Sequence, residues 1–428
     1  MPLDRVGINR YDERMWNRRP ELTGETTLEV AIDPAEVGGV GKKGSKRIAG
    51  IDIARGIAIY LMIQSHTVKG LLYFRDMPDW GIWPMHTLTK ISSSLFVIVY
   101  GVTLGVIFLP RTLTGKWKAT AKHLWWRALV VIFWYKVLIL VQTLQTRSPD
   151  VIIDMLLYVK FPDFVEILNF YGWIMLGIPL LLPLWRKLPI WAGLAIAIGL
   201  ALLGKLLSYW DFGGVVQIKA MVVEHKGYFC YGVLTRGPMA LFGIFLGDLI
   251  GRAVDFHQRR KQVAMGLVGV GLFMVLLMFI TYQENLSRIL VDMAKNIGKH
   301  PPQTYFVLFS TGGALFILGL CLFIKGRGPW ILKPFEILGK ESLVTFNFHI
   351  IFIFLGLRWL FGLKRFKHPE VTYGQALLLV FVTTAACIGA ALLNTARKKR
   401  KRARKQAEEA RLEAEREAEK QMMKEFDR

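Results

Sequence analysis

The sequence predicts an all-α polytopic membrane protein with about ten transmembrane helices and both termini in the cytoplasm. Three observations lead to this prediction. The 428 residues are 53% hydrophobic and 12% aromatic. They contain many apolar runs close to 20 residues long, the length of helix that spans a hydrocarbon core of about 30 Å. Most of the excess positive charge, a net +23 at pH 7, lies in short loops and tails beside these runs, a pattern that sets membrane topology.

The first five apolar segments are each long enough to form one spanning helix. These segments are residues 49–66, 91–109, 124–144, 163–185 and 188–209.

The next five segments continue the pattern. The sixth is short and rich in glycine from Phe242 to Asp248, which leaves a tilted, a broken or an extended helix as alternatives. The partly apolar region 210–236 before it is a candidate re-entrant segment. These five segments are residues 237–251, 263–281, 304–324, 338–362 and 374–394.

The orientation follows from the distribution of Lys and Arg. With a cytoplasmic N-terminus, the loops left inside hold these residues at a much higher density than the loops left outside. Both tails are also strongly basic beside the membrane, so we expect both termini inside. The inner loops are residues 110–123, 186–187, 252–262 and 325–334.

Three regions are expected along the chain. Residues 1–47 form a polar cytoplasmic tail without a cleavable signal peptide, and residues 48–394 form the transmembrane domain. Residues 395–428 form a basic and charged cytoplasmic helical tail. This last region is either a stop-transfer anchor followed by a loosely solvated helix or a partner-binding coiled coil, although sustained heptads are missing.

The basic composition does not indicate a nucleic-acid partner, because topology alone accounts for the charge. The three cysteines, Cys230, Cys321 and Cys387, fit no metal or redox spacing. We therefore expect no metal site.

The first apolar segment carries the strongest functional signal. An arginine at the centre of a spanning helix costs roughly 2.5–3.5 kcal/mol, and ionisable groups inside a membrane are functional by default. Arg55 and His66 are eleven residues apart, which is about 16 Å along a helix axis. A histidine at the mouth of a cavity is a candidate general base. Alternatively, Asp52 and Arg55 neutralise each other and His66 is interfacial.

Polar residues on three further segments are candidates for the same site. Ser342, Asn347 and His349 lie on an otherwise apolar span, where His349 either acts in the site or bonds a neighbouring helix. Glu166 and Asn169 share a helix face at the external end of their span and contact either substrate or the first span.

The second segment, from Met85 to Gly105, combines small and polar residues. Gly101 and Gly105 form a small-xxx-small pair, which is typical of a close helix contact. The serines 92–94 line a polar cavity or serve helix packing, and His86 is expected to be an exposed loop histidine.

Four segments in order resemble bacterial membrane acyltransferases of the acyltransferase-three type. The first is Gly50-Ile-Asp-Ile-Ala-Arg-Gly-Ile-Ala with His66, and the second is His86 to Gly105. The third is the glycine-rich run from Arg236 to Arg252, and the fourth is Leu-Gly-Lys-Glu-Ser-Leu followed by His349. The resemblance covers roughly residues 48–394, which makes these residues the expected acyltransferase domain.

The same segments are similar to the heparan glucosaminide acetyltransferase and glucan succinyltransferase branches of this superfamily. The position of His66 favours the bacterial O-acyltransferase pattern over the heparan type, whose histidine lies in the first external loop, near position 76 here. Phe346 stands where the family often has an aromatic hydroxyl.

The resemblance implies transfer of an acyl group, often acetyl, from cytosolic acetyl-CoA or another acyl-CoA to a hydroxyl of an extracytoplasmic glycan or glycolipid. His66 would then be the base or the carrier of the acyl group, and Arg55 would hold the donor or position Asp52. The substrate-binding candidates are Glu166, Asn169, Ser342, Asn347 and His349. The candidates for binding the CoA phosphates are Arg111, Lys116 and Arg259, although membrane topology alone also explains these cations.

The competing functions are a transporter or flippase of a glycan or lipid-linked intermediate and a membrane scaffold acting through its charged tail. No inverted repeat of the kind found in many transporters is visible in the sequence. We expect an integral protein of the cell membrane, surrounded by lipid, that acts on a glycan. A homo-oligomer is a candidate state of the protein.

Overall fold

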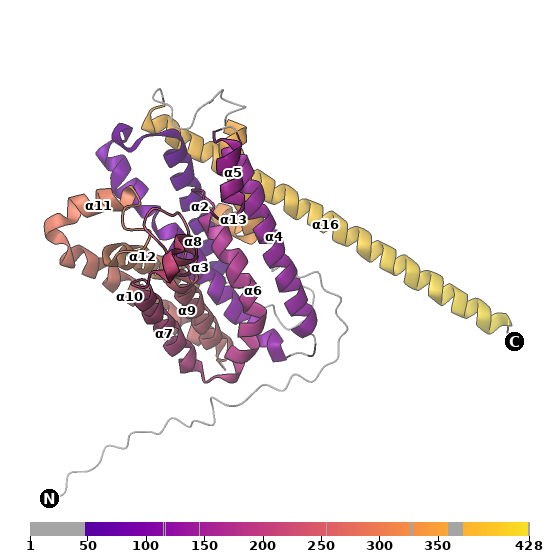
Figure 1. The fold of residues 1–428 in the computed structure, drawn as a ribbon. Helices are drawn as coiled ribbons and strands as arrows, with labels where there is room; N and C mark the ends of the chain where they lie inside the picture. Colours follow the sequence, from indigo (N-terminus) through magenta and orange to yellow (C-terminus); the bar gives the residue numbers. More distant parts are fainter. Residues whose placement is uncertain are drawn as a thin grey trace, which may run out of the picture. The chain divides into compact units, whose positions relative to one another are not determined.

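The computed structural model describes residues 48–113, 115, 117–144, 146–253, 255–325, 328–357 and 371–426. All regular secondary structure in these residues is helical, so the predicted all-α fold is confirmed for this part of the chain. The chain divides into residues 1–45 and 46–428, and the fold described here belongs to the second unit (Figure 1). The predicted polar tail 1–47 lies outside the described residues.

The helices follow the apolar segments closely. A π-helical turn at Leu104–Phe108 prolongs α3, and the whole stretch from Gly81 to Leu113 is kinked at Trp83, where the backbone is not helical. The principal helices are α2 (Ala49–Leu71), α3 (Ile91–Thr103), α4 (Trp117–Thr143), α5 (Pro149–Leu156), α6 (Glu166–Lys187), α7 (Ile190–Leu207), α8 (Val216–Val223), α9 (Val233–Gly251), α10 (Phe256–Thr281), α11 (Leu286–Ala294), α12 (Thr304–Leu322), α13 (Lys333–Lys340), α14 (Ser342–Ile351) and α16 (Tyr373–Phe426).

Eight helical stretches among the described residues are long and apolar enough to cross a membrane, or nine if one bent pair counts as a single span. The helix α2 is not among them despite its 23 residues, because polar residues such as Asp52, Arg55 and Gln64 interrupt its apolar run. The protein is thus a multi-span membrane protein by length and composition. The count of ten spans and the cytoplasmic position of both termini remain predictions.

The helix α2 lies at the centre of the bundle and packs against α3, α12, α13, α14 and α16. Glycine makes the closest of these approaches possible. A Cβ atom on Gly56 would lie 1.8 Å from the Phe335 carbonyl oxygen of α13, and one on Gly339 would lie 1.8 Å from the Asp52 carbonyl oxygen. The polar side chains of α2 are therefore held at fixed positions by backbone-to-backbone packing.

The contact between α3 and α9 is equally close. A Cβ atom on Gly101 would lie 2.0 Å from the Ala240 carbonyl oxygen, and one on Gly243 would lie 2.3 Å from the Ile98 carbonyl oxygen. The same pattern repeats one turn further along, at Gly105. The close helix contact predicted from Gly101 and Gly105 is confirmed.

The predicted span 338–362 is not one straight helix. Its helical turns break at Glu341, where the stretches Trp330–Lys340 and Ser342–Gly356 bend by 84°. The buried Glu341 carboxylate accepts hydrogen bonds from Asn394 (2.7 Å) and Lys398 (3.0 Å) of α16. These hydrogen-bond donors compensate the buried charge of Glu341 and so stabilise the break. The break lets α13 lie against the start of α2.

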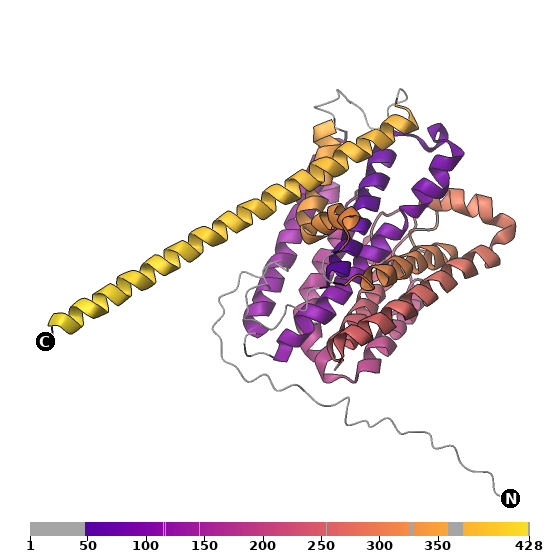
Figure 2. The ribbon, with the colours of Figure 1, turned by 180° about the vertical axis from the view of Figure 1, so that it is seen from behind.

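The helix α16 runs without interruption from the last apolar segment into the charged tail (Figure 2). Its first part packs against α2, α13 and α14. Residues 401–418 and 421–423 are exposed, and pairs four residues apart such as Arg411–Glu415 (2.8 Å) support the helix there.

Candidate active site

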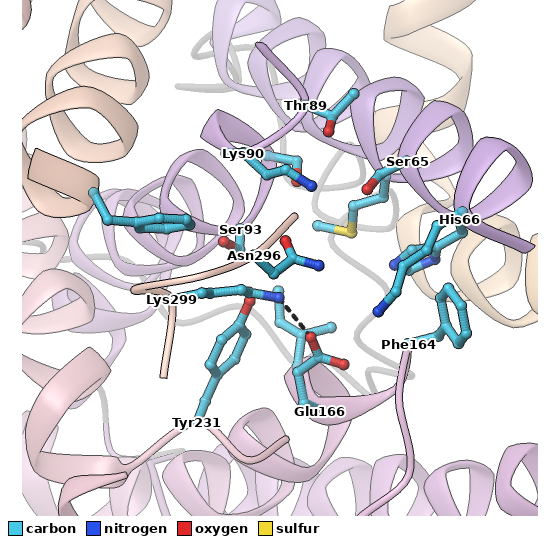
Figure 3. A pocket seen from close by; sticks show the side chains of 15 residues that line it. Ser65, His66, Thr89, Lys90, Ser93, Phe164, Glu166, Tyr231, Asn296 and Lys299 are labelled. Carbon is cyan, nitrogen blue, oxygen red and sulfur yellow. Dashed lines mark hydrogen bonds and ion pairs between the residues drawn. The ribbon is translucent and has the colours of Figure 1, made fainter. Parts of the chain in front are cut away.

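A polar cavity lies beside the C-terminal half of α2 (Figure 3). Its volume is about 40 Å³, the space of a few water molecules. His66 lies on one side of it, and four segments far apart in the sequence complete the wall. The lining residues are Met62, Ser65, His66, Lys69, Thr89, Lys90, Ser92, Ser93, Phe164, Glu166, Ile167, Tyr231, Asn296, Lys299 and Phe306.

Hydrogen bonding fixes the tautomer of His66. The Nδ1 atom of His349 lies 3.3 Å from the Thr345 carbonyl oxygen, which can only accept, so His349 Nδ1 carries a proton and donates it. Neutral His349 then has an unprotonated Nε2, 3.0 Å from His66 Nδ1, which must be the donor. His66 Nε2 is thereby the basic nitrogen of its ring. We call His66, His349 and the Thr345 carbonyl the histidine relay.

Packing holds both rings of the relay in place. The two imidazoles lie nearly parallel, at an interplanar angle of 18°. Phe164 packs edge-on against His66 at 5.1 Å, and Phe346 packs edge-on against His349 at 5.0 Å between ring centroids. His349 is fully buried. A rigidly oriented base is what general-base catalysis requires.

An ion pair forms the wall opposite the relay. Lys299 Nζ lies 2.7 Å from Glu166 Oε1, the first residue of α6. Burial on its own would lower the pKa of Lys299, but the attraction of Glu166 outweighs it and raises the pKa above its ordinary range. Lys299 is therefore a cation. The second oxygen of the buried Glu166 carboxylate has no hydrogen-bond partner within the described part of the chain.

The cavity contains only some of the residues singled out in the sequence. His66 and Glu166 line it, and His349 reaches it through His66. Asn169 lies elsewhere, accepting a hydrogen bond from Trp173 Nε1 (3.1 Å) and donating one to Cys230 Sγ (3.6 Å).

Arg55 lies in the N-terminal half of α2 and connects three helices, α2, α3 and α13. It donates hydrogen bonds to Thr103 Oγ1 of α3 (2.6 Å), to the Gly339 carbonyl of α13 (3.2 Å) and to Asp52 Oδ1 (3.4 Å). The expected proximity of Asp52 and Arg55 is observed. These contacts are compatible both with a packing role and with the expected place of Arg55 next to the acyl donor.

The remaining candidates lie outside the cavity lining. Ser342 begins α14, and Asn347 is buried on the same helix. Arg111 packs over the Phe108 ring at 5.3 Å, and Arg259 lies in the first turn of α10. Lys116 is outside the described residues.

Several cavity residues were not predicted, above all Lys90, Asn296 and Lys299. The expectation that His86 is an exposed loop histidine is wrong: it is fully buried, with its Nε2 3.3 Å from Lys90 Nζ. In the sequence, His86 and Lys90 are four residues apart just before an apolar run, and this spacing was the signal that could have identified them. Both lie on the helical stretch that continues into α3.

A buried network supports the loop that carries Lys299. Glu224 accepts hydrogen bonds from Arg236 Nε (2.8 Å) and His300 Nδ1 (2.7 Å), and Arg236 also donates to the Lys299 carbonyl (2.8 Å). Burial alone would raise the pKa of Glu224, but Arg236 outweighs it, so the pKa is lowered. The carboxylate is therefore ionised at neutral pH.

Replacing Glu224 with glutamine should destabilise the protein by about 3–5 kcal/mol at pH 7, because Arg236 is left as an uncompensated buried charge. A carboxylate whose pKa is lower in the folded protein than its unfolded value of about 4.3 stabilises the folded state at pH values above about 4.3. This stabilisation is lost as the pH falls through the folded-state pKa. The difference between wild type and Glu224→Gln should be constant above about pH 5 and should shrink below it. Thermal unfolding of the purified protein at several pH values measures this, with the exposed Glu284→Gln as control. A difference that grows on acidification would contradict the assignment.

Comparison with protein families identifies most of the chain. Residues 48–395 match the model of a family described as an acyltransferase domain, which is most of the chain. No curated protein matches. Among the described residues, no group of three or more His, Cys, Asp or Glu side chains could hold a metal ion.

Proposed function

Because the chain belongs to the acyltransferase-three family, we propose that it transfers an acyl group, in the first instance acetyl, from an acyl-CoA to a hydroxyl bound in the polar cavity. Four segments of the sequence had predicted this family over residues 48–394. The observation that supports the proposal most strongly is the histidine relay, which aligns His66 as a base at the cavity wall.

The proposed reaction follows from the position of His66 Nε2. This nitrogen removes the proton of the acceptor hydroxyl as the oxygen attacks the thioester carbonyl carbon of the acyl-CoA. The new C–O bond forms, the C–S bond breaks, and the CoA thiolate leaves and takes up the proton. Acyl carriage on His66 itself is the covalent variant of the same step.

The donor is proposed to enter from the cytoplasmic side. Arg55 lies eleven residues before His66 on α2, or about 16 Å along the axis, which separates the two ends of the site. Arg111, Lys116 and Arg259 are the proposed contacts for the CoA phosphates, and Arg55 with Asp52 is the proposed inner end of the site. No metal takes part in the proposed reaction.

The acceptor is proposed to be an extracytoplasmic glycan or glycolipid, reached from the outer face of the cell membrane, with both termini inside. Asn169, Ser342 and Asn347 remain proposed acceptor contacts. A homo-oligomer is compatible with this scheme. The family match gives no support to the alternative of a transporter or flippase.

The function can be tested with the purified full-length protein in lipid vesicles. Thiol release from [14C]acetyl-CoA and incorporation of label into a glycan fraction should rise together above the protein-free background. Vesicles that move glycan across the bilayer without releasing thiol would identify a transporter and refute the proposal.

A further inference from the structure

The lining of the polar cavity contains more lysines than carboxylates. Three lysines line it, Lys69, Lys90 and Lys299, against a single lining carboxylate, Glu166. Of these, Lys299 is paired with Glu166 at 2.7 Å. Lys69 lies 3.7 Å from Asp163 and over the Phe164 ring at 4.9 Å.

Lys90 has no such counter-charge. It is only 5% exposed, and within the described part of the chain no carboxylate lies within ion-pair distance of its Nζ. Its polar neighbour is His86 Nε2 at 3.3 Å, a ring nitrogen without a negative charge. Burial without a compensating anion disfavours the charged ammonium form of a lysine, so an anion supplied by a ligand would stabilise that form at this site.

The surrounding groups face the same space as Lys90. In Figure 3 the polar ends of Lys90, Asn296 and Lys299 point into the cavity, and Ser65 and His66 of α2 lie on its other side. The cavity thus presents hydrogen-bond donors around Lys90 together with the candidate base His66.

We propose that the acceptor carries a carboxylate or phosphate group, which Lys90 binds so that a neighbouring hydroxyl meets His66 Nε2. This inference rests on the proposed function and specifies its substrate class. Lys90 then raises the affinity for charged acceptors only. A group that stabilised the oxyanion of the reaction would instead act equally on charged and neutral acceptors.

The first experiment measures binding. Thermal unfolding of the purified full-length protein is followed with methyl β-D-glucuronide, glucose 6-phosphate and methyl β-D-glucoside as probes. The charged sugars should raise the unfolding temperature more than the neutral one, and the Lys90→Gln variant should lose this difference. The exposed Lys295→Gln, on the loop that carries Lys299, is the matched control and should retain it.

The second experiment measures transfer from [14C]acetyl-CoA to the same sugars. Lys90→Gln should raise KM for the charged acceptors by about 10–100-fold, the range for one hydrogen bond to a charged group, with little change for the glucoside. Comparison of the glucuronide with the phosphate distinguishes the two kinds of anion.

The outcomes separate this inference from the proposed function. Equal stabilisation by charged and neutral sugars, or an equal loss of kcat for both in Lys90→Gln, would overturn the charged acceptor while leaving acyl transfer intact. A Lys90-dependent preference for charged sugars without any thiol release would instead support the anion site and refute the acyltransferase reaction.

Discussion

Replacing His66 with alanine should lower acyl transfer by about 10²–10⁴-fold, the contribution typical of a positioned general base. His66 is the member of the histidine relay whose Nε2 remains basic, and it lies at the wall of the polar cavity. The loss should appear in kcat, because removal of the base does not remove the cationic groups that face the acceptor. Initial rates of thiol release from acetyl-CoA at matched protein levels measure it.

The relay also predicts how a second change combines with the first. His349 orients His66 through the 3.0 Å contact between their ring nitrogens, so it is a positioning residue. His349→Ala should cause a smaller loss and shift the pH profile of kcat, and the double variant should be no worse than His66→Ala alone. The exposed His257→Ala is the control. Near wild-type transfer by His66→Ala would refute the mechanism.

Replacing Gly101 with valine should prevent α3 and α9 from packing. The first added carbon would lie 2.0 Å from the Ala240 carbonyl oxygen, a backbone atom that cannot rotate away. The helices must then separate, and we expect a loss at or beyond the upper end of the roughly 1–3 kcal/mol that overpacking costs. The yield of monodisperse protein after detergent extraction should fall sharply.

The control for this variant is Gly266→Val. Gly266 lies on α10, where a Cβ atom would meet nothing within 4 Å. Both variants add the same side chain to a helix in an apolar segment, so a difference between them reports the close contact. Equal yields from the two variants would mean that α3 and α9 do not approach each other as described.

The sequence predicted the helical segments well because the hydropathy that a bilayer demands is local. The break at Glu341 was not predictable, because its stability depends on Asn394 and Lys398, more than fifty residues further along the chain. The run Leu-Gly-Lys-Glu-Ser lies inside residues 338–362, which were predicted as a single span. A buried carboxylate becomes favourable only once its distant donors are in place.

The site was predictable to the extent that polar side chains interrupted apolar helices. His66, His349 and Glu166 were identified on that ground, but their pairing needed the fold. Lys299 was missed since it lies in a polar loop, where a lysine ordinarily faces water. The burial of Lys90 results from contacts with other elements, which no local pattern encodes.

The histidine relay ends on a peptide carbonyl, the neutral oxygen of Thr345. In a Ser-His-Asp triad the final member is an anion that stabilises the protonated imidazole. Here the last acceptor offers only a dipole, so the imidazolium has no anionic partner within the relay and is a short-lived species. The CoA thiolate should therefore take up the proton at nearly the same time as it leaves, so the protonated imidazole should not accumulate.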